Sequence, residues 1–341
     1  MSEHTTQAGK KLANSRKFNT VFPSVLLAGS LLTLAACGGG GGSDDAVPVA
    51  TTATFGLQVS DAPVNDAAAV VVCFNAIELV GNGSATQKYL IGSDAVAAAP
   101  NNLCQNAQGN VIANSRGVDL LKLPGALAES LVSGATVPAG NYGQLRLVLS
   151  EGSYIQLKDG SKKTLSVPSN ELKLLGPTLS AGGTFSYTLE FDLRKAVVNN
   201  KTGQNYQLKP TGLRLVDTSQ IGHLTGSVSE TLLINNQCTV APSDKTKPVG
   251  VVYLYKGADL APATLGDYGG TQANLPYASA PVLFDGAASY NYQIGFIDAG
   301  TYTAAFSCNT VDDPEQVDVV TFLATKTQAI TANKTPVVLN F

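Results

Sequence analysis

Strict alternation of apolar and polar residues constrains this chain more than any other feature of its sequence. From Thr184 to Asp192, aromatic or aliphatic residues occupy every second position, and hydroxyl or acidic residues lie between them. This period of two is that of a β-strand, because successive side chains point to opposite faces of a sheet. The pattern predicts a strand with one buried face and one solvated face.

Strands are predicted along most of the chain, separated by glycine-containing turns. Residues 142–149 repeat the alternation, and residues 69–79 are apolar on both faces, as expected of a central strand. One short helix is predicted over residues 126–132, with Leu127 and Leu131 on one face. The expected fold class is all-β with one short helix.

The C-terminal part of the chain predicts a second set of strands. They are expected at residues 224–234, 249–255, 290–297, 302–308, 318–323 and 336–341. The predicted boundary between the two sets falls at residues 218–222, and the chain is long enough for two cores. We therefore expect two β-sandwich domains, over residues 53–218 and 223–341.

The N-terminus predicts export. The first 20 positions are polar, with four Lys or Arg residues against one acid, and an apolar run from Val21 to Ala36 follows. The run is shorter than the roughly 20 residues that span a membrane, and small residues close it, which together describe a secretory signal peptide over residues 1–36. The ending Leu34-Ala35-Ala36-Cys37 resembles the bacterial lipobox, which implies cleavage before Cys37 and acylation of that cysteine, palmitate included.

A membrane anchor is expected to follow from that cleavage. Residues 37–52 contain the glycine run Gly38–Gly42, which predicts a flexible tether, and several acyl chains on Cys37 would attach the protein stably. Gly38, not aspartate, follows the cysteine, which by resemblance to other lipoproteins favours the outer membrane, at its periplasmic face or the cell surface. The alternative is an ordinary signal peptide with an incidental cysteine.

Four further cysteines predict two disulfides, because an exported protein with an even number usually pairs them. Three pairings are open, and the predicted domain division favours Cys73–Cys104 and Cys238–Cys308. Unpaired buried thiols remain an alternative. A cysteine metal site is disfavoured because no C-x-x-C spacing occurs.

The charge balance excludes one class of partner. The chain has a net charge of −3, and loss of the basic signal peptide would make it more negative. Nucleic-acid binding needs basic patches that neutralise phosphates, so no nucleic acid is expected. The expected partners are the membrane, through the lipid anchor, and an envelope protein or glycan.

Catalytic motifs are scarce. His223 is the only histidine after the predicted cleavage site, so neither a serine triad nor a histidine zinc site can be assembled in the usual way. Phosphate-binding and dinucleotide motifs do not occur. We expect no enzyme activity and no cofactor, and we interpret His223 as structural or simply exposed.

Acidic residues carry the remaining candidate chemistry. The loop at residues 312–318 holds four carboxylates and could offer oxygen ligands to calcium, but its spacing does not match an EF-hand and a solvated acidic turn explains it equally well. Asp61 and Asp66 flank Pro63, where side-chain bonding to a turn is the ordinary explanation.

Several motifs share their order with a known family. They are Val59-Ser60-Asp61-Ala62-Pro63, Val118-Asp119-Leu120-Leu121-Lys122-Leu123, Pro138-Ala139-Gly140-Asn141-Tyr142, Val167-Pro168-Ser169-Asn170-Glu171-Leu172-Lys173-Leu174, Phe191-Asp192-Leu193-Arg194-Lys195 and Leu208-Lys209-Pro210. In order and spacing the chain resembles the bacterial lipoprotein domain-of-unknown-function family 4382 over about residues 53–218, although Asn170 stands where the family usually has glycine. The resemblance implies a β-sandwich on an exported lipoprotein and no established activity.

The second domain has a looser resemblance, to transthyretin-like or carboxypeptidase-regulatory-like sandwiches of the broader immunoglobulin-like type. It rests on Asp298-Ala299-Gly300-Thr301-Tyr302-Thr303, a tight turn whose tyrosine is expected to fill the core. The first domain has an echo of this turn in Ala139-Gly140-Asn141-Tyr142. Domains with such folds serve mostly as binding or spacer modules, and fold alone does not give function.

Three functions follow as hypotheses. The leading one is a membrane-anchored, non-catalytic lipoprotein that binds or adheres to an envelope component, glycan or protein partner. The second is a carboxylate-dependent glycan hydrolase, which would need two acids facing each other across a cleft. The third is a structural spacer or assembly factor, which would show an exposed apolar patch or an open sheet edge.

Overall fold

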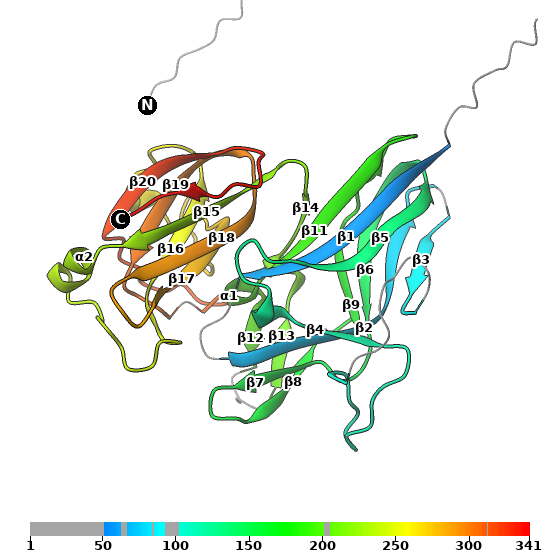
Figure 1. Ribbon diagram of the computed structural model, residues 1–341, viewed down its shortest axis with the longest axis horizontal. Coiled ribbons are helices and arrows are strands. Elements are labelled where there is room, and N and C mark those ends of the chain that lie inside the picture. Colours follow the sequence, from blue (N-terminus) through cyan, green and yellow to red (C-terminus); the bar gives the residue numbers. More distant parts are fainter. Residues whose placement is uncertain (1–50, 63–66, 84, 93–101, 201–204, 312) are drawn as a thin grey trace, which may run out of the picture. The chain divides into compact units, whose positions relative to one another are not determined.

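The computed structural model describes residues 51–62, 67–83, 85–92, 102–200, 205–311 and 313–341, all of which belong to one compact unit. Strands predominate and helices are few and short (Figure 1), so the predicted all-β class is confirmed. The predicted signal peptide and Cys37 lie outside the described residues. None of the described helices is long and apolar enough to span a membrane.

The first sheet has four strands in the order β14-β11-β1-β5. Their bounds are β1 (Thr52–Ala62), β5 (Glu129–Pro138), β11 (Thr184–Asp192) and β14 (Leu213–Asp217). β1 runs parallel to β11 and antiparallel to β5. The strand predicted from the alternation at residues 184–192 is β11, and that prediction is confirmed.

The second sheet has ten strands and runs β10-β6-β2-β7-β8-β13-β12, with β3 and β4 paired to β2 and β9 paired to β6. Their bounds are β2 (Ala67–Gly81), β3 (Gln87–Leu90), β4 (Arg116–Asp119), β6 (Gly140–Leu149), β7 (Tyr154–Leu157), β8 (Lys162–Ser166), β9 (Glu171–Leu175), β10 (Thr178–Leu179), β12 (Val197–Asn199) and β13 (Asn205–Leu208). β2 is the predicted central strand, and neighbouring Val71 and Val72 are both buried.

These two sheets enclose one core. Phe55 and Leu57 on β1 pack in the same apolar cluster as Ile77 on β2 and Leu145 on β6. Each such side chain contributes roughly 1.5–3 kcal/mol when it leaves water. Burial of these alternate positions explains why the strands keep their register, since a slip of one residue would expose the whole apolar set.

The third sheet follows in the chain and has the order β20-β19-β16-β17-β18-β15-β21. Its strands are β15 (Ile221–Val228), β16 (Pro248–Lys256), β17 (Ala278–Phe284), β18 (Tyr290–Asp298), β19 (Gly300–Ser307), β20 (Ala324–Ile330) and β21 (Val337–Val338). Its strands carry a separate cluster of buried apolar side chains. The strands predicted near residues 249–255, 290–297 and 302–308 are confirmed, whereas the division into two domains and the transthyretin-like resemblance stay predictions.

Two tyrosines close equivalent corners in these sandwiches. The hydroxyl of Tyr142 donates to the carbonyl of Pro138, and that of Tyr302 donates to the carbonyl of Asp298, both at 2.8 Å and both four residues back. The echo between the two turn sequences therefore corresponds to one shared local structure, in which a buried tyrosine ties a strand to the turn before it.

The predicted helix at residues 126–132 is wrong. Strand β5 begins at Glu129 and pairs with β1, while Leu127 is 57% exposed and Leu131 is buried, so the two leucines do not share a face. An isolated helix of this length is marginal in water, whereas pairing along β1 satisfies the backbone polar groups at once.

The described helices are short and lie elsewhere: α1 (Leu193–Ala196), α2 (Glu230–Asn235), and the 3-10 turns η1 (Leu120–Lys122), η2 (Pro210–Gly212) and η3 (Pro262–Thr264). The predicted strand 224–234 is therefore wrong beyond Val228. Ser229 begins α2 as its N-cap, because its hydroxyl oxygen accepts the backbone N–H of Leu232 at 3.3 Å.

Two predicted strands near the C-terminus need correction. Residues 318–323 form no strand; Phe322 instead packs edge-on against Tyr253 and Tyr255, at 5.8 and 5.9 Å between ring centroids. The apolar alternation there reflects packing on the sheet, not membership of it. The predicted strand 336–341 shrinks to the two residues of β21, which pair with β15.

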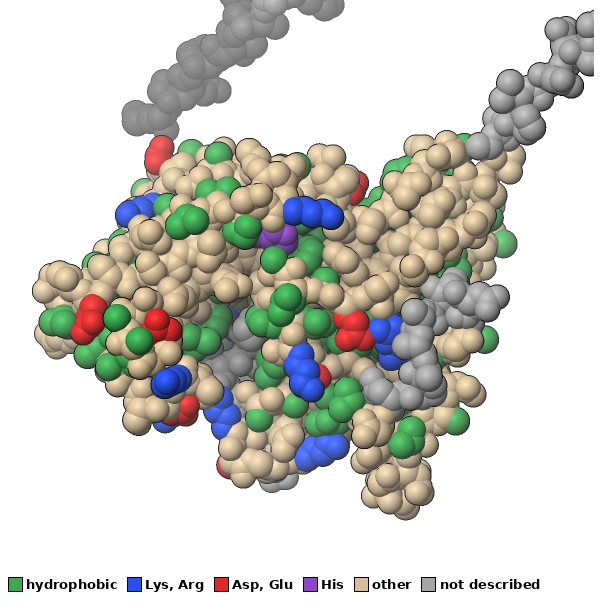
Figure 2. All heavy atoms as spheres, in the orientation of Figure 1, with side chains coloured by type: hydrophobic (Ala, Val, Ile, Leu, Met, Phe, Trp, Pro, Cys, Tyr) green, Lys and Arg blue, Asp and Glu red, His purple; other side chains and the backbone are tan. Residues whose placement is uncertain are grey.

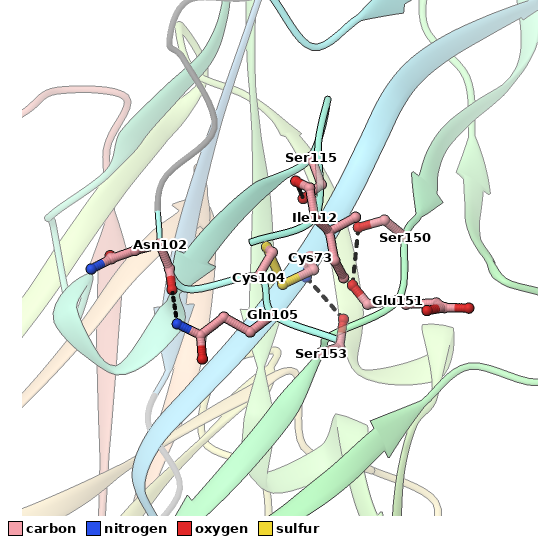
Figure 3. The surroundings of a disulfide bond; sticks show 9 residues. All are labelled: Cys73, Asn102, Cys104, Gln105, Ile112, Ser115, Ser150, Glu151 and Ser153. Carbon is pink, nitrogen blue, oxygen red and sulfur yellow. Dashed lines mark hydrogen bonds between the residues drawn. A yellow bond between two sulfur atoms is a disulfide. The ribbon is translucent and has the colours of Figure 1, made fainter. Parts of the chain in front are cut away.

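Both cysteine pairs lie as predicted. Cys73 and Cys104 are linked with their Cα atoms 5.8 Å apart, and Cys238 and Cys308 with theirs 5.6 Å apart. Figure 3 shows the first pair, where the backbone N–H of Cys73 also donates to the Ser153 hydroxyl at 2.9 Å. This link attaches the loop before β4 to the second face of β2, which is why that strand is apolar on both sides.

Candidate functional site

A groove of about 610 Å³ lies where the first sheet meets the third. Gln58 and Ser186 line it from β1 and β11, and His223 and Phe296 line it from β15 and β18. In Figure 2 the histidine, in purple, is surrounded by mostly uncharged atoms with one Lys or Arg side chain beside it. The groove has the size of a small-molecule site.

Hydrogen bonds between side chains fix one wall of this groove. Alternation along β1 sends Leu57 to the core and Gln58 to the outer face. The Gln58 side-chain amide donates to the Thr188 hydroxyl at 2.8 Å, and the Thr188 and Thr218 hydroxyl oxygens lie 3.0 Å apart. These hydrogen bonds orient the Gln58 side-chain amide. The side-chain oxygen of Gln58 has no hydrogen-bond partner among the residues described.

His223 forms part of the opposite wall. Its Nδ1 accepts the backbone N–H of Phe296 at 3.2 Å, so the neutral ring carries its proton on Nε2. Burial lowers the pKa of His223, which favours this neutral form at pH 7. The buried, hydrogen-bonded ring agrees with the interpretation of His223 as structural, and the residue also lines the groove.

A bulge in β18 positions that wall. One residue of β15, His223, lies opposite two residues of β18, Gly295 and Phe296. Phe296 has a φ of 48°, which is uncommon for a bulky side chain and is seen mainly where surrounding structure enforces it. A Cβ on Gly295 would lie 1.8 Å from the carbonyl oxygen of Gly125, so only glycine lets the 124–128 loop pack here.

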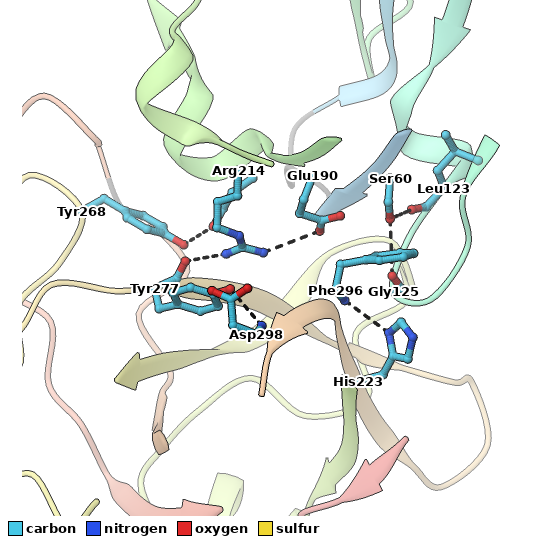
Figure 4. Close-up of polar contacts among 11 residues, drawn as sticks. Ser60, Leu123, Gly125, Glu190, Arg214, His223, Tyr268, Tyr277, Phe296 and Asp298 are labelled. Carbon is cyan, nitrogen blue, oxygen red and sulfur yellow. Dashed lines mark hydrogen bonds and ion pairs between the residues drawn. The ribbon is translucent and has the colours of Figure 1, made fainter. Parts of the chain in front are cut away.

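A buried polar cluster lies behind the groove. Arg214 on β14 donates to the carbonyl of Tyr277 at 2.5 Å and lies 4.4 Å from the centroid of its ring. On its other side its guanidinium is 4.0 Å from Glu190 (Figure 4). The Tyr268 hydroxyl donates to Asp192. These contacts join the first sheet to the segment between η3 and β17.

Burial disfavours the charged form of the acids in this cluster. Glu190 is 1% exposed, and burial raises its pKa to about 8 despite the opposing effect of Arg214. Burial likewise raises the pKa of Asp192, opposed by its bond from Tyr268. Neither Glu190 Oε2 nor Asp192 Oδ1 has a hydrogen-bond partner among the described residues. The sequence placed both acids on the wet face of their strand, and that expectation is wrong because the third sheet covers them.

Asp61 is a further buried acid. It is fully buried inside β1, and neither carboxylate oxygen has a hydrogen-bond partner among the residues that the structure describes. The turn that it was expected to bond, at residues 63–66, lies outside the described residues, so the turn-bonding explanation stays a prediction. Burial, then repulsion from Glu190, raises its pKa well above the usual value. Asp66 lies outside the described residues.

The acidic loop uses its carboxylates for its own backbone. Asp318 accepts the backbone N–H of Asp313, and Asp313 accepts that of Glu315. Asp312 lies outside the described residues. Within the part of the chain that the structure describes, no three His, Cys, Asp or Glu side chains are grouped so as to hold a metal ion.

A comparison with known protein families finds a similarity in the first part of the chain. Residues 52–210 match the family described as "Domain of unknown function (DUF4382)". Over these residues the chain is similar to that family. The matched residues include Gln58 and Ser186 of the groove and Glu190 and Asp192 of the cluster behind it, while His223 and Phe296 follow them.

Other comparisons add little. No curated protein matches the chain. Among solved structures, a leucine-rich repeat protein from Bacteroides thetaiotaomicron matches with 12% identity and a TM-score of 0.19, covering 85% of this chain and 26% of that one. The chain thus spans about a quarter of that protein, and a likeness this low carries no argument about fold or function.

Sequence reasoning missed most of the groove and the whole buried cluster. Gln58, Ser186 and Arg214 are single polar residues on strands, without motif or spacing that sets them apart. Glu190 and Asp192 offered a faint signal, because two acids end a strand otherwise lined with hydroxyl side chains. The cysteines were found because an even number in an exported protein predicts disulfides, and the predicted division into two sets of strands gave the partners.

Proposed function

We propose that this protein is an outer-membrane lipoprotein, anchored through acylated Cys37, whose DUF4382 domain and C-terminal sandwich hold a ligand in the groove between β1, β11, β15 and β18 without transforming it. The anchor rests on the lipobox resemblance and the apolar run before it. The ligand is a component of the envelope, most simply a glycan.

One observation carries the binding part of this proposal. The groove is lined by donors and acceptors already held in place, namely the His223 ring and the Gln58 amide, beside a bulge strained at Phe296. Polar groups fixed before a ligand arrives lose little freedom on binding, so they favour specific recognition. Bulges of this kind are common where a strand must aim a side chain at a ligand.

The same geometry favours binding over hydrolysis. Glycan hydrolysis needs two carboxyl groups on either side of the scissile bond. No Asp or Glu is among the described residues lining the groove, and Glu190 and Asp192 are buried beneath the third sheet. The hydrolase hypothesis therefore receives no support from this groove.

Two measurements test the proposal. Intact mass of membrane-extracted protein should show loss of residues 1–36 and added acyl mass, and a Cys37→Ala variant should show neither acylation nor membrane retention. Binding to an array of envelope glycans should then be detected and should be lost in a Ser186→Tyr variant, which fills the groove from an exposed position. An unprocessed chain would refute the proposed lipid anchor. Binding unaffected by Ser186→Tyr would refute the groove as the binding site.

A further inference from the structure

Two nitrogen donors, and no Asp or Glu, are among the described residues that line the groove. His223 lines the groove, and its Nε2–H is the ring donor left over, because Nδ1 already accepts the Phe296 backbone N–H. Lys334 lines the same groove, is exposed, and takes part in none of the ion pairs formed among the described residues. The nearby carboxylate of Asp217 accepts both the backbone N–H and the hydroxyl of Ser219, which occupies one of its oxygens.

The rest of the lining is suited to a hydroxylated ring. Ser186 and Ser219 offer hydroxyl groups that both donate and accept, and the Gln58 carbonyl oxygen accepts. Ala126 and Ala128 provide small apolar contacts on one side. A ligand that combined several hydroxyl groups, a compact apolar face and one negative group would satisfy all of these at once.

We propose that the groove binds a sugar residue that carries a carboxylate, with the ammonium of Lys334 and the Nε2–H of His223 on the carboxylate and with Gln58 and Ser186 on the ring hydroxyls. This assignment deepens the proposed function and rests on it. A carboxylate accepts two donors through its two oxygens, and a charged partner makes such hydrogen bonds stronger than neutral ones. The neutral histidine adds a directed donor where a second cation would bind any anion less selectively.

The test compares an acidic sugar with its uncharged counterpart. The mature chain in detergent is titrated with galacturonic acid trisaccharide and with the fully methyl-esterified trisaccharide, which keeps the rings and removes the charges. We expect the acid to bind at least about tenfold more tightly, as loss of a charge-assisted hydrogen bond implies. Its affinity should fall as salt rises from 0.05 to 0.5 M, roughly a threefold shorter screening length.

Variants test which residues cause the preference for the acidic sugar. Lys334→Gln should weaken binding of the acid about tenfold and leave the ester unchanged. Lys247→Gln makes the same charge change at an exposed position outside the groove and should alter neither affinity. Ser186→Tyr should abolish binding of both sugars, since it fills the groove without touching a charge.

The possible outcomes distinguish the carboxylate assignment from the proposed binding function. Equal binding of acid and ester, both lost in Ser186→Tyr, would overturn the carboxylate assignment and leave the binding function standing. Binding of another glycan in the envelope array but of neither trisaccharide would overturn the ligand class alone. Failure of every glycan in the array would overturn both proposals, and acid binding unchanged in Lys334→Gln would show that the groove does not recognise the charge as proposed.

Discussion

Replacing Glu190 by glutamine should remove a large part of the pH dependence of stability. Glu190 lies on β11 opposite Ser60 and Arg214, nearly without solvent, and its Oε2 has no hydrogen-bond partner among the described residues. The Arg214 guanidinium is 4.0 Å away, too far for a hydrogen bond. A carboxylate in this position is poorly solvated and incompletely paired, so folding favours its protonated form.

The magnitude follows from the pKa. Burial raises the pKa of Glu190 from 4.5 to about 8 on folding. At about 1.36 kcal/mol for each pKa unit, the ceiling on the effect is about 5 kcal/mol. Because the folded state holds the proton more tightly, the full stability is present below pH 4.5, falls as pH rises from 4.5 to 8, and stays low above 8. The pKa of Asp61 and of Asp192 is raised as well and acts in the same direction.

Urea denaturation of a soluble chain beginning after the tether, at several pH values between 4.5 and 9, measures this directly. Glu190→Gln should match wild type near pH 4.5, because its amide resembles the protonated acid, and should exceed wild type by several kcal/mol at pH 8.5. The residual slope in the variant belongs to the aspartates. Glu151→Gln, at an exposed turn, is the matched control and should keep the wild-type profile. Parallel curves for Glu190→Gln and wild type would refute the argument that this buried carboxyl titrates on unfolding.

Three further changes probe the framework. Gly295→Ala should destabilise the protein by about 1–3 kcal/mol, because its Cβ would meet a loop carbonyl at 1.8 Å; a loss below 0.5 kcal/mol by urea denaturation would contradict that contact. Tyr302→Phe should cost about 1 kcal/mol through loss of its bond to the carbonyl four residues back, read as a lower urea midpoint. Replacing Cys238 and Cys308 by alanine should lower stability by about 4 kcal/mol, as expected for a link closing 70 residues, and should abolish most of the effect of reductant on the melting temperature of this part.

Much of the fold was predictable because its determinants are local. The strands at residues 142–149 and 290–297 show their period in the sequence, and the buried faces of β6 and β18 follow it. The two tyrosine corners were visible as a repeated turn, since both share the order Ala-Gly-x-Tyr, in which glycine permits the tight turn before the core tyrosine. Pairing of the cysteines followed from the division of the strands into two sets.

The errors came where local pattern and long-range packing disagree. Residues 126–132 have leucines at helical spacing, but β1 offers an unpaired edge that makes a strand of them. Phe322 alternates as a strand residue would, yet packs on the outside of β16 through Tyr253 and Tyr255. In both cases the competing partner is distant in sequence, so no window of neighbouring residues contains it.

In strand β11, the sequence determined which side chains share a face, and the tertiary structure decided which of them meet solvent. Its period of two determined that it is a strand and that Leu189 and Phe191 face the core. Whether its other face meets water depended on where the third sheet lies: Ser186 stays open and lines the groove, whereas Glu190 is covered. The physical reason is that a side chain's face follows from its own backbone, but its solvation and pKa follow from whatever distant element packs above it.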